Sequence, residues 1–535
     1  MDILIKNGLI VDGTGAAPFA GDVLVSGDRI LRVGRDLKAP GAKVVDATGK
    51  TVIPGLIDPH LHEEWICFAD GKYEMFLRQG VTTTVNGNCG HSIAPGPRKN
   101  VVEYYYGNGL MSERQREAYR ESFPEWEDFD GYAKAVEDKG VNINLCVLMG
   151  HGTLRWTAMK GAHERPPTKE EAAEMTRVLE EALSQGAFGI SYGLDYVPGR
   201  YATTEELAQF AAPVQKAGGV AAAHLRHRLG VLEATEEFLE VGRRTGVRLQ
   251  VSHLKPSCPE AFAAVRKYAD AGGKALVDTI PASTAHCQSK DRALLFMMST
   301  SDELFDQGLE GVKKAIRTPE GRALLRKDPY FVNRDQSLNT LWKTGDPEMD
   351  GKSVAELAEK AGQDPKEYLL DLLASDRDFI LWCGGAHRRD FSMETHGPDI
   401  VANPYVCAGG DEILGDPEYP FDWYELLRRG ALPIFIQGNL SKGMPLEEVI
   451  RRNTSMVADH FSIAARGRLA PGYFADIAIV DLPNYAFDGE DEVTPLNPLN
   501  MARGVDCVLV NGQPVLEGGE VKDAFSGRVL RRGKE

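Results

Sequence analysis

The chain of 535 residues lacks several features that mark membrane-bound, secreted or nucleic-acid-binding proteins. No uncharged apolar run reaches roughly 18 residues, so we expect no transmembrane helix. The first residues lack the basic start and the apolar stretch of a signal peptide. Lys and Arg number 61 against 78 Asp and Glu, a formal charge of −17, and no basic cluster is present. This balance argues against nucleic acid and against a membrane as partners.

Cysteine is sparse as well. The eight cysteines are scattered between positions 67 and 507, and none forms a Cys-x-x-Cys pair. This density is far below that of a disulfide-stabilised scaffold, so we expect a reducing, cytoplasmic location. Most of the thiols are then expected to be small buried apolar groups. No Gly-x-x-x-x-Gly-Lys phosphate loop is present either.

What the chain does contain is a long alternation of apolar strands and helical segments. Eight strand candidates follow one another at residues 51–57, 81–86, 143–149, 188–192, 220–223, 248–252, 275–279 and 405–408. Helical patterns lie between most of them, and the one at residues 168–185 opens with Thr168 and Glu171, a capping box. This alternation predicts an α/β protein with a parallel sheet, and eight strands favour a closed (β/α)8 TIM-like barrel.

Both ends of the chain are instead rich in short strands and tight turns, including Asn511-Gly512. We predict that residues 1–51 and 466–535 form one small β-sandwich domain beside a barrel of residues 52–465. About 125 residues separate the seventh strand from the eighth. We expect an insertion at about residues 285–400 with structure of its own, because a spacer of this length commonly serves as a lid or a substrate wall.

Metal-binding residue types follow several of these strands, at the end where a barrel carries its active site. The first strand runs into Asp58-Pro59-His60-Leu61-His62, and residues two apart in an extended segment point to the same side. Cys89 follows the second strand, His224 the fifth, His253 the sixth and Asp411 the eighth. Imidazole, thiolate and carboxylate are the ligands that zinc takes in proteins, and one thiolate can serve two ions.

Each of these residues also has an ordinary structural explanation. A histidine at a strand end often only donates a hydrogen bond, a lone cysteine often only packs, and Asp411 could cap a helix or a turn. The coincidence of these residue types at separate strand ends favours a metal centre with an aspartate beside a metal-bound water. Zinc lowers the pKa of such a water to roughly 7. His151, after the third strand, fits a structural or a site role equally well.

Seven motifs resemble the amidohydrolase superfamily and, within it, the N-acyl-D-amino-acid deacylases (D-aminoacylases). They are ILIKNGLIVDGTG (3–15), VIPGLIDPHLH (52–62), GVTTTVNGNCGHSIAP (80–95), GLDYVPGRYATTEEL (193–207), HLR (224–226), SHLK (252–255) and GRLAPGYFADIAIVD (467–481). The cysteine after the second strand is the most specific feature, since other amidohydrolases commonly use a carboxylated lysine as the bridge. The resemblance extends over essentially the whole chain.

This resemblance implies a role for each matching residue. Cys89, His224 and His253 would hold one tightly bound Zn²⁺, and His60 and His62 would share Cys89 in a second, weaker site. Asp411 would act as general base and then as general acid. Lys255 would neutralise a substrate carboxylate, with Tyr192 and Arg226 as further substrate-binding residues. The implied reaction is hydrolysis of the amide bond of a small N-acyl amino acid, expected to be D-configured.

Two departures from the family pattern leave the substrate open. Relatives usually carry Asp-Val-Tyr-Pro-Tyr after the seventh strand, where this chain has Asp278-Thr279-Ile280-Pro281-Ala282, and Ser-Asp-Gly where it has Gly410-Asp411-Glu412. A cyclic-amide hydrolase of the hydantoinase or dihydropyrimidinase type, or a deaminase, would use the same barrel and metal chemistry. A non-catalytic barrel scaffold predicts lost ligands, whereas here every ligand is present. The sequence leaves open whether the protein forms a homo-oligomer.

Overall fold

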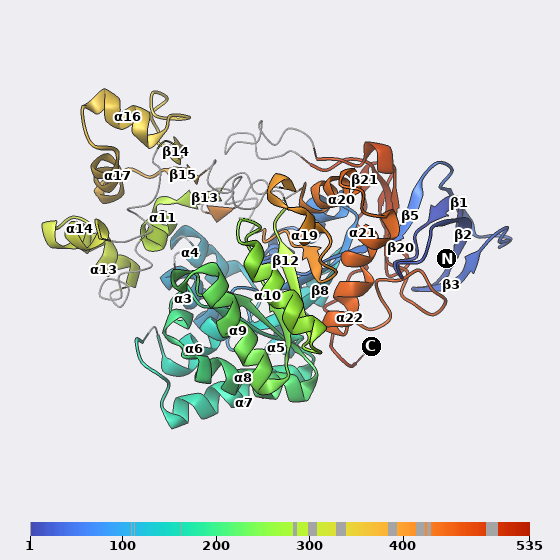
Figure 1. Cartoon of the computed structure of the whole chain (residues 1–535), viewed down its shortest axis with the longest axis horizontal. Helices are drawn as coiled ribbons and strands as arrows, with labels where there is room; N and C mark the ends of the chain where they lie inside the picture. Colours follow the sequence, from blue (N-terminus) through green and yellow to red (C-terminus); the bar gives the residue numbers. More distant parts are fainter. Residues whose placement is uncertain are drawn as a thin grey trace.

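The structure is a computed structural model of the whole chain, shown in Figure 1. The residues described are 2–108, 110–111, 113–161, 163–281, 286–297, 308–327, 337, 339–383, 393–412, 423–424, 430–487 and 501–534.

A parallel barrel forms the centre of the molecule and confirms the predicted fold class. Its eight strands are β6 (Leu56–Asp58), β7 (Val81–Asn86), β8 (Asn144–Gly150), β9 (Gly189–Gly193), β10 (Val220–His224), β11 (Arg248–Val251), β12 (Ala275–Thr279) and β16 (Val406–Ala408). Neighbours along this series are hydrogen-bonded in parallel register. All except the first match the predicted strands to within one residue at either end.

The seam between β6 and β16 is joined largely by side chains. Asn453 accepts a hydrogen bond from the Ala408 amide at 3.0 Å and donates to the carbonyls of Ala408 and Ile57 at 2.8 and 3.3 Å. Just above, the Asp58 carboxylate accepts a hydrogen bond from the Gly410 amide. Beyond it, the Asp411 amide donates to the His60 carbonyl at 2.7 Å, which draws both ends of the seam toward the same point.

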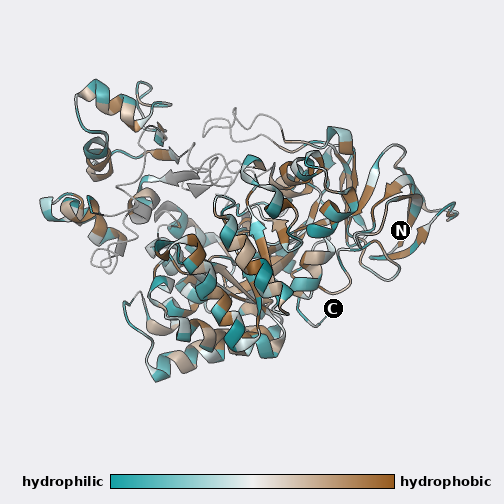
Figure 2. Ribbon diagram, in the orientation of Figure 1, coloured by the Kyte–Doolittle hydropathy of each residue, from teal (hydrophilic) through white to brown (hydrophobic). Residues whose placement is uncertain are grey.

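Helices cover the outside of the barrel. They include α5 (Phe129–Lys139), α7 (Lys169–Gln185), α8 (Thr204–Ala217), α9 (Val231–Thr245), α10 (Pro259–Asp270), α20 (Ala431–Ser441) and α21 (Leu446–Arg452). The predicted capping box of Thr168 and Glu171 opens α7. Apolar and polar residues alternate along these ribbons in Figure 2, as expected for helices that pack on one face. α22 (Ser455–Phe461) packs with residues such as Val85, Leu148 and Leu276 in one buried cluster.

The first predicted strand, residues 51–57, is divided in two at Gly55. β5 (Thr51–Pro54) pairs with β1 (Ile3–Ile10) and with β18 (Ile477–Val480), whereas β6 starts the barrel. A Cβ at Gly55 would lie 2.1 Å from Oγ1 of Thr82, so only glycine allows this close crossing. The strands therefore favour a boundary near residue 55 rather than 51, although the domain limits themselves stay a prediction.

The two ends of the chain meet in a single sheet of nine strands among the described residues. The order is β21-β20-β19-β18-β5-β1-β2-β3, and β4 (Lys43–Asp46) pairs with β1. The remaining members are β2 (Phe19–Ser26), β3 (Arg29–Gly34), β19 (Val505–Val510), β20 (Gln513–Glu517) and β21 (Glu520–Val521). Ile5, Val25, Ile477 and Leu509 belong to one buried cluster, so the predicted sandwich is one continuous sheet whose two halves share a core.

The segment between β12 and β16 has a separate core, as its length predicts. Leu294, Val312, Leu341 and Leu381 belong to this core. The segment contributes β14 (Asn339–Trp342), β15 (Ile380–Cys383) and β13 (His286–Ser289) to a small sheet, in that order, and β17 (Trp423–Tyr424), which follows β16 in the chain, pairs with β13. Two helices follow one another in this segment, α16 (Val354–Ala361) and α17 (Pro365–Ala374). Gly362, with φ +67°, ends the first, and Pro365 begins the second. Residues 301–307 lie outside the described residues, and α13 (Gly308–Ala315) follows them.

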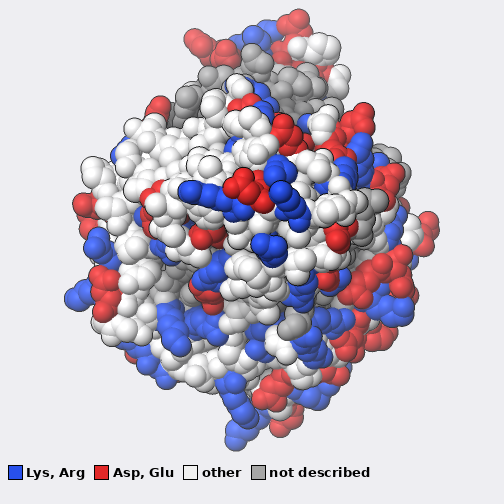
Figure 3. All heavy atoms as spheres, turned by 90° about the vertical axis from the view of Figure 1, so that its right-hand side faces the viewer, with Lys and Arg blue, Asp and Glu red and all other residues white. Residues whose placement is uncertain are grey.

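In the described ranges, no helix combines the length and the apolar character needed to cross a membrane. Figure 3 shows the face on the side of the terminal sheet, where Lys and Arg are interspersed with Asp and Glu. This mixed distribution agrees with the absence of a basic cluster from the sequence.

Candidate metal centre

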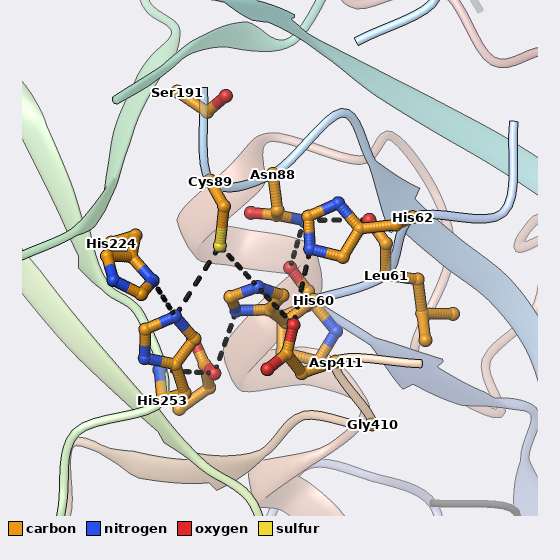
Figure 4. A network of polar contacts seen from close by, with 12 residues as sticks. His60, Leu61, His62, Asn88, Cys89, Ser191, His224, His253, Gly410 and Asp411 are labelled. Carbon is orange, nitrogen blue, oxygen red and sulfur yellow. Dashed lines mark hydrogen bonds and ion pairs between the residues drawn. The ribbon is translucent and has the colours of Figure 1, made fainter. Parts of the chain in front are cut away.

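The predicted ligands and the predicted base meet at the carboxyl ends of the barrel strands (Figure 4). His60 and His62 follow β6, Cys89 follows β7, His224 ends β10, His253 follows β11 and Asp411 follows β16. All of these side chains are buried. His60 and Asp411 are 351 positions apart in the chain and yet lie in the same polar centre.

Cys89, His224 and His253 form the first group of ligand atoms. Sγ of Cys89 lies 3.4 Å from Nε2 of His253, and that nitrogen lies 2.8 Å from Nδ1 of His224. All three ligand atoms lie within 4.8 Å of one another. Two imidazoles and one sulfur are a ligand set for zinc, with one tetrahedral position left for water.

A second group contains His60, His62, Cys89 and Asp411. Nε2 of His60 lies 3.3 Å from Sγ of Cys89 and 3.3 Å from Oδ1 of Asp411. Nε2 of His62 lies 3.2 Å from the same carboxylate oxygen. Cys89 belongs to both groups, which is the geometry required of a ligand that bridges two ions.

The backbone at three of these positions is in the left-handed region. Cys89 has φ +52°, His253 φ +36° and Asp411 φ +47°. Such conformations typically cost on the order of 1–3 kcal/mol each in residues other than glycine and are concentrated at functional sites. Ser191 holds the Cys89 loop, since its hydroxyl donates to the Gly87 carbonyl at 2.5 Å and accepts from the Gly90 amide at 3.0 Å.

A carboxylate holds the ring of His60 from the side away from the centre. Oδ1 of Asp278 lies 3.0 Å from Nδ1 of His60 and accepts a hydrogen bond from the His253 amide at 2.8 Å. Its other oxygen accepts from Gln250 at 2.6 Å. With its proton on Nδ1, His60 presents the lone pair of Nε2 to Cys89 and Asp411.

The donor set fits a cation. Burial lowers the pKa of His224 to about 4, against the raising effect of Asp195, so its imidazole is neutral and carries a lone pair. Burial also raises the pKa of the Cys89 thiol to about 11, although His60 opposes this effect. A thiolate at this depth therefore requires a neighbouring positive charge. Ring nitrogens of four histidines and one sulfur converge here, and a borderline-soft divalent ion such as zinc matches them.

Comparison with known proteins agrees with this geometry. The family model described as "Amidohydrolase family" matches residues 43–365. The chain belongs to this family. D-aminoacylase from Alcaligenes xylosoxydans xylosoxydans is 29% identical over 99% of this chain and 98% of its own length. N-acyl-D-aspartate deacylase from the same organism is also 29% identical, over 99% of this chain and 95% of its own.

Solved structures resemble the amidohydrolase over its full length. N-acyl-D-glutamate deacylase from Bordetella bronchiseptica, complexed with zinc and a phosphonate inhibitor, superimposes with a TM-score of 0.75 at 26% identity, covering 99% of both chains. A D-hydantoinase structure gives 0.55 at 16% identity, with 100% of this chain and 99% of that chain covered, and shows the fold alone. The protein is thus a hydrolase of carbon–nitrogen bonds other than peptide bonds.

The three predicted substrate residues of the amidohydrolase lie in different surroundings. Tyr192 is fully buried in β9, and its hydroxyl donates to the Leu207 carbonyl at 2.8 Å. Arg226 is buried and donates to Glu237 and to the carbonyls of Arg200 and Ala202. The structure gives Tyr192 and Arg226 structural contacts, and their substrate roles stay predictions.

Lys255 follows His253 by two residues and is only partly buried, at the same end of the barrel. This position suits the predicted contact with a substrate carboxylate. His151, by contrast, begins α6 (His151–Met159) and lies 3.0 Å from a carboxylate oxygen of Glu206. Its ring packs against Tyr192 and Phe210, so it belongs to the wall outside the metal centre.

The sequence interpretation missed four residues around the ligands. Asp278 braces His60, Tyr196 lies with its hydroxyl 3.2 Å from Nδ1 of His224, and Asp195 and His227 lie behind that ring. Asp278 could have been found from the sequence, because it lies near the end of the seventh strand, and the candidate ligands also lie at or just after strand ends. Asp195 and Tyr196 lie in a loop and His227 begins a short helix, so no strand end marks them.

Proposed function

We propose that this amidohydrolase removes the acyl group from an N-acyl amino acid, with D configuration, using zinc. The observation that carries the proposal is the shared position of Cys89. Its sulfur lies 3.3 Å from His60 and 3.4 Å from His253, so one thiolate can serve both ligand groups while Asp411 faces them. Relatives named for D-aminoacylase, N-acyl-D-aspartate deacylase and N-acyl-D-glutamate deacylase activity support the substrate class.

Cys89, His224 and His253 would hold the tightly bound ion, and His60 and His62 with the shared Cys89 would hold a weaker one. When bound, zinc supplies a Lewis acid that polarises the substrate carbonyl and makes water more acidic. One related structure is described in terms of a binuclear metal center in D-aminoacylase, with one-metal activation and second-metal attenuation. This agrees with a tight and a weak position of unequal importance.

Asp411 is placed to move the protons of the reaction. Its side chain is 13% exposed, and its Oδ1 points toward the ring nitrogens of both His60 and His62. Asp411 takes a proton from water as the water oxygen forms a bond to the carbonyl carbon. It then gives that proton to the amide nitrogen as the carbon–nitrogen bond breaks. The products are a carboxylic acid and a free amino acid, and no other reactant is needed.

The remaining predictions concern the surroundings of the reaction. Lys255, next to the His253 ligand, would pair with the α-carboxylate of the substrate. The described cysteines at positions 67, 89, 146, 258, 407 and 507 are free thiols, which suits a reducing cytoplasm. A small-molecule amide is the partner proposed here.

A substrate screen with zinc-loaded protein tests the proposal. The panel pairs N-acetyl-D- and N-acetyl-L-amino acids with apolar and acidic side chains, and adds hydantoins, dihydropyrimidines and aminated nucleobases. We expect release of free D-amino acid, with the L series slower. Ring opening or ammonia release without deacylation would replace the proposal with the cyclic-amide hydrolase or the deaminase.

A further inference from the structure

A carboxylate lies behind the zinc-ligand candidate His224. Oδ2 of Asp195 is 3.3 Å from Nε2 of His224, while Nδ1 on the other side of the ring is 2.8 Å from Nε2 of His253. Asp195 lies in the loop that follows β9, two residues after the strand ends. The ring of His224 therefore stands between the first ligand group and Asp195.

The two ring nitrogens of His224 must play different parts. A neutral imidazole has one lone pair and one N–H, and only the lone pair can bind a metal ion. Because Nδ1 faces His253, the N–H is on Nε2, where Asp195 accepts it. A charged acceptor at this nitrogen fixes the orientation of the ring and increases the electron density on Nδ1.

His227 holds Asp195 in place. Both the backbone amide and Nδ1 of His227 lie near the same oxygen of Asp195, at 3.2 and 3.1 Å. This oxygen of Asp195 therefore lies within hydrogen-bond distance of three nitrogens, one from the ring of His224 and two from His227.

Arg226 explains why these two loops stay together. It directly precedes the short helix η2 (His227–Leu229), and its guanidinium donates to the carbonyls of Arg200 and Ala202, each at 2.7 Å. Both carbonyls belong to the chain segment that carries Asp195. Arg226 is buried, so its fork joins the loop after β9 to the loop after β10 and keeps His227 opposite Asp195.

We propose that Asp195, held by His227, is a positioning residue that orients His224 and sets the affinity of the tight metal site. The inference rests on the proposed function, because it assumes that His224 is a zinc ligand. The effect of Asp195 passes through His224, as the effect of Asp278 passes through His60.

An outer cation position is the alternative for the same atoms. Asp195, His224 and His227 offer ligand atoms within 4.8 Å of one another. An ion at this position would need a lone pair on Nε2 of His224. That nitrogen carries the proton of the ring when Nδ1 is a metal ligand. The two groups could both be filled only if the ring lost its last proton, so the hydrogen bond is favoured over a further ion.

The experiment measures zinc retention by the full-length zinc-loaded protein against rising concentrations of a chelator. Substituting the carboxylate by Asp195→Ala should weaken retention by about 10–100-fold, the usual effect of such a partner. Asp195→Asn keeps an acceptor for Nε2–H but removes the charge, so it should lose less, about 3–10-fold. His227→Ala should fall between wild type and Asp195→Ala, because its backbone amide still reaches Asp195. His163→Gln, on an exposed residue, is the matched histidine control.

Two further readouts separate a positioning role from general damage. In the cobalt-substituted protein, the absorption bands of the Cys89-bound ion should shift in Asp195→Ala, since the ring of His224 is no longer fixed. The midpoint of thermal unfolding of the isosteric Asp195→Asn protein should equal that of wild type. The zinc retention of this variant therefore tests the inference even if Asp195→Ala folds poorly.

The outcomes are distinct. Unchanged zinc retention within about twofold in both Asp195 variants, beside a wild type that binds zinc, would overturn this inference alone. If the Asp195 variants lost one equivalent of zinc while the tight site kept its affinity, the inference would be overturned, and Asp195 would instead be a ligand of a further ion at the outer cation position. A wild type that binds no zinc would overturn the proposed metal centre, and the inference with it.

Discussion

Cys89 is the one side chain shared by the two groups of ligand atoms. It follows β7, adopts a left-handed backbone conformation and is buried between His60 and His253. No neighbouring ring can replace it, because each imidazole reaches only its own part of the centre. At the scale of single residues, the metal site therefore depends most on this thiol.

We expect Cys89→Ala to lose the tightly bound zinc. The affinity should fall by more than about 100-fold, since even residues that only support a ligand typically account for 10–100-fold. Elemental analysis after dialysis measures the loss. Cys258→Ala, at a partly exposed cysteine outside both groups, should keep its zinc. A metal content equal to wild type in Cys89→Ala would remove Cys89 from the ligand set.

Asp411 is the second residue with a specific expectation. Asn at this position has nearly the same shape but cannot accept the proton of water. We expect Asp411→Asn to keep most of its zinc, because the tight group does not include Asp411, and to lose about 10²–10⁴-fold in turnover. Turnover and metal content are measured on the same sample, with Asp399→Asn in an exposed turn of α19 (Pro398–Val401) as control. Wild-type turnover would contradict the proposed base.

At the scale of elements, the centre exists because parallel strands end together. The candidate ligands lie at the ends of β6, β7, β10 and β11, and the proposed base lies at the end of β16. β16 reaches β6 across the seam that Asn453 fills. The position of Asp411 relative to His60 is thus set by how this seam closes.

Asn453→Ala should open the seam. The side chain is fully buried, and its removal leaves the amide and carbonyl of Ala408 and the carbonyl of Ile57 without it. An unsatisfied buried group costs about 1–3 kcal/mol, so we expect the free energy of unfolding to fall by about 3 kcal/mol. Denaturant unfolding measures this change. Asn484→Ala, at an exposed asparagine, should stay within about 0.5 kcal/mol of wild type, and an equal effect of both would contradict the role of Asn453.

Many of the helices and strands, and the residues at the strand ends, could be predicted from the sequence. The alternation of strands and helices is local, and so is the appearance of His, Cys and Asp at strand ends. The break at Gly55 could not, because it arises where the chain passes from the terminal sheet to the barrel against Thr82. Asn453 could not be predicted either, since its partners lie 45 and 396 positions away.

At the scale of the whole molecule, the barrel is closed below by α22 and flanked by a sheet made from both chain ends. His460 lies near the end of α22, with its Nε2 buried and without a hydrogen-bond partner among the described residues. Burial and the nearby guanidinium of Arg248 lower the pKa of His460 to about 3. This histidine therefore makes the stability of the whole protein depend on pH.

The sign follows from the lowered pKa. Between an unfolded value of about 6.5 and the folded value of about 3, the unfolded chain binds a proton that the folded chain does not. His460 should thus reduce the free energy of unfolding by about 1.4 kcal/mol per unit of pH as the pH falls through this window. Above pH 6.5 it should have no such effect.

His460→Asn should remove this contribution. The difference in unfolding free energy between wild type and variant, measured by urea unfolding at several pH values, should change steeply between pH 6 and 4 and be flat above pH 7. His163→Gln, at an exposed histidine, is the matched control. Parallel pH profiles for wild type and His460→Asn would contradict the assignment.

The sequence by itself predicted the barrel, the candidate ligands and the proposed base, because each lies in a short stretch whose strand or turn character is local. It also placed the chain ends together as β-structure. Only the tertiary structure decided which nitrogen of His224 and His60 faces the centre, because Asp195 and Asp278 come from other parts of the chain. It likewise decided that Arg226 fastens two loops and that Tyr192 is bound to a helix backbone, since hydrogen-bond partners are set by proximity in space and not by order in the chain.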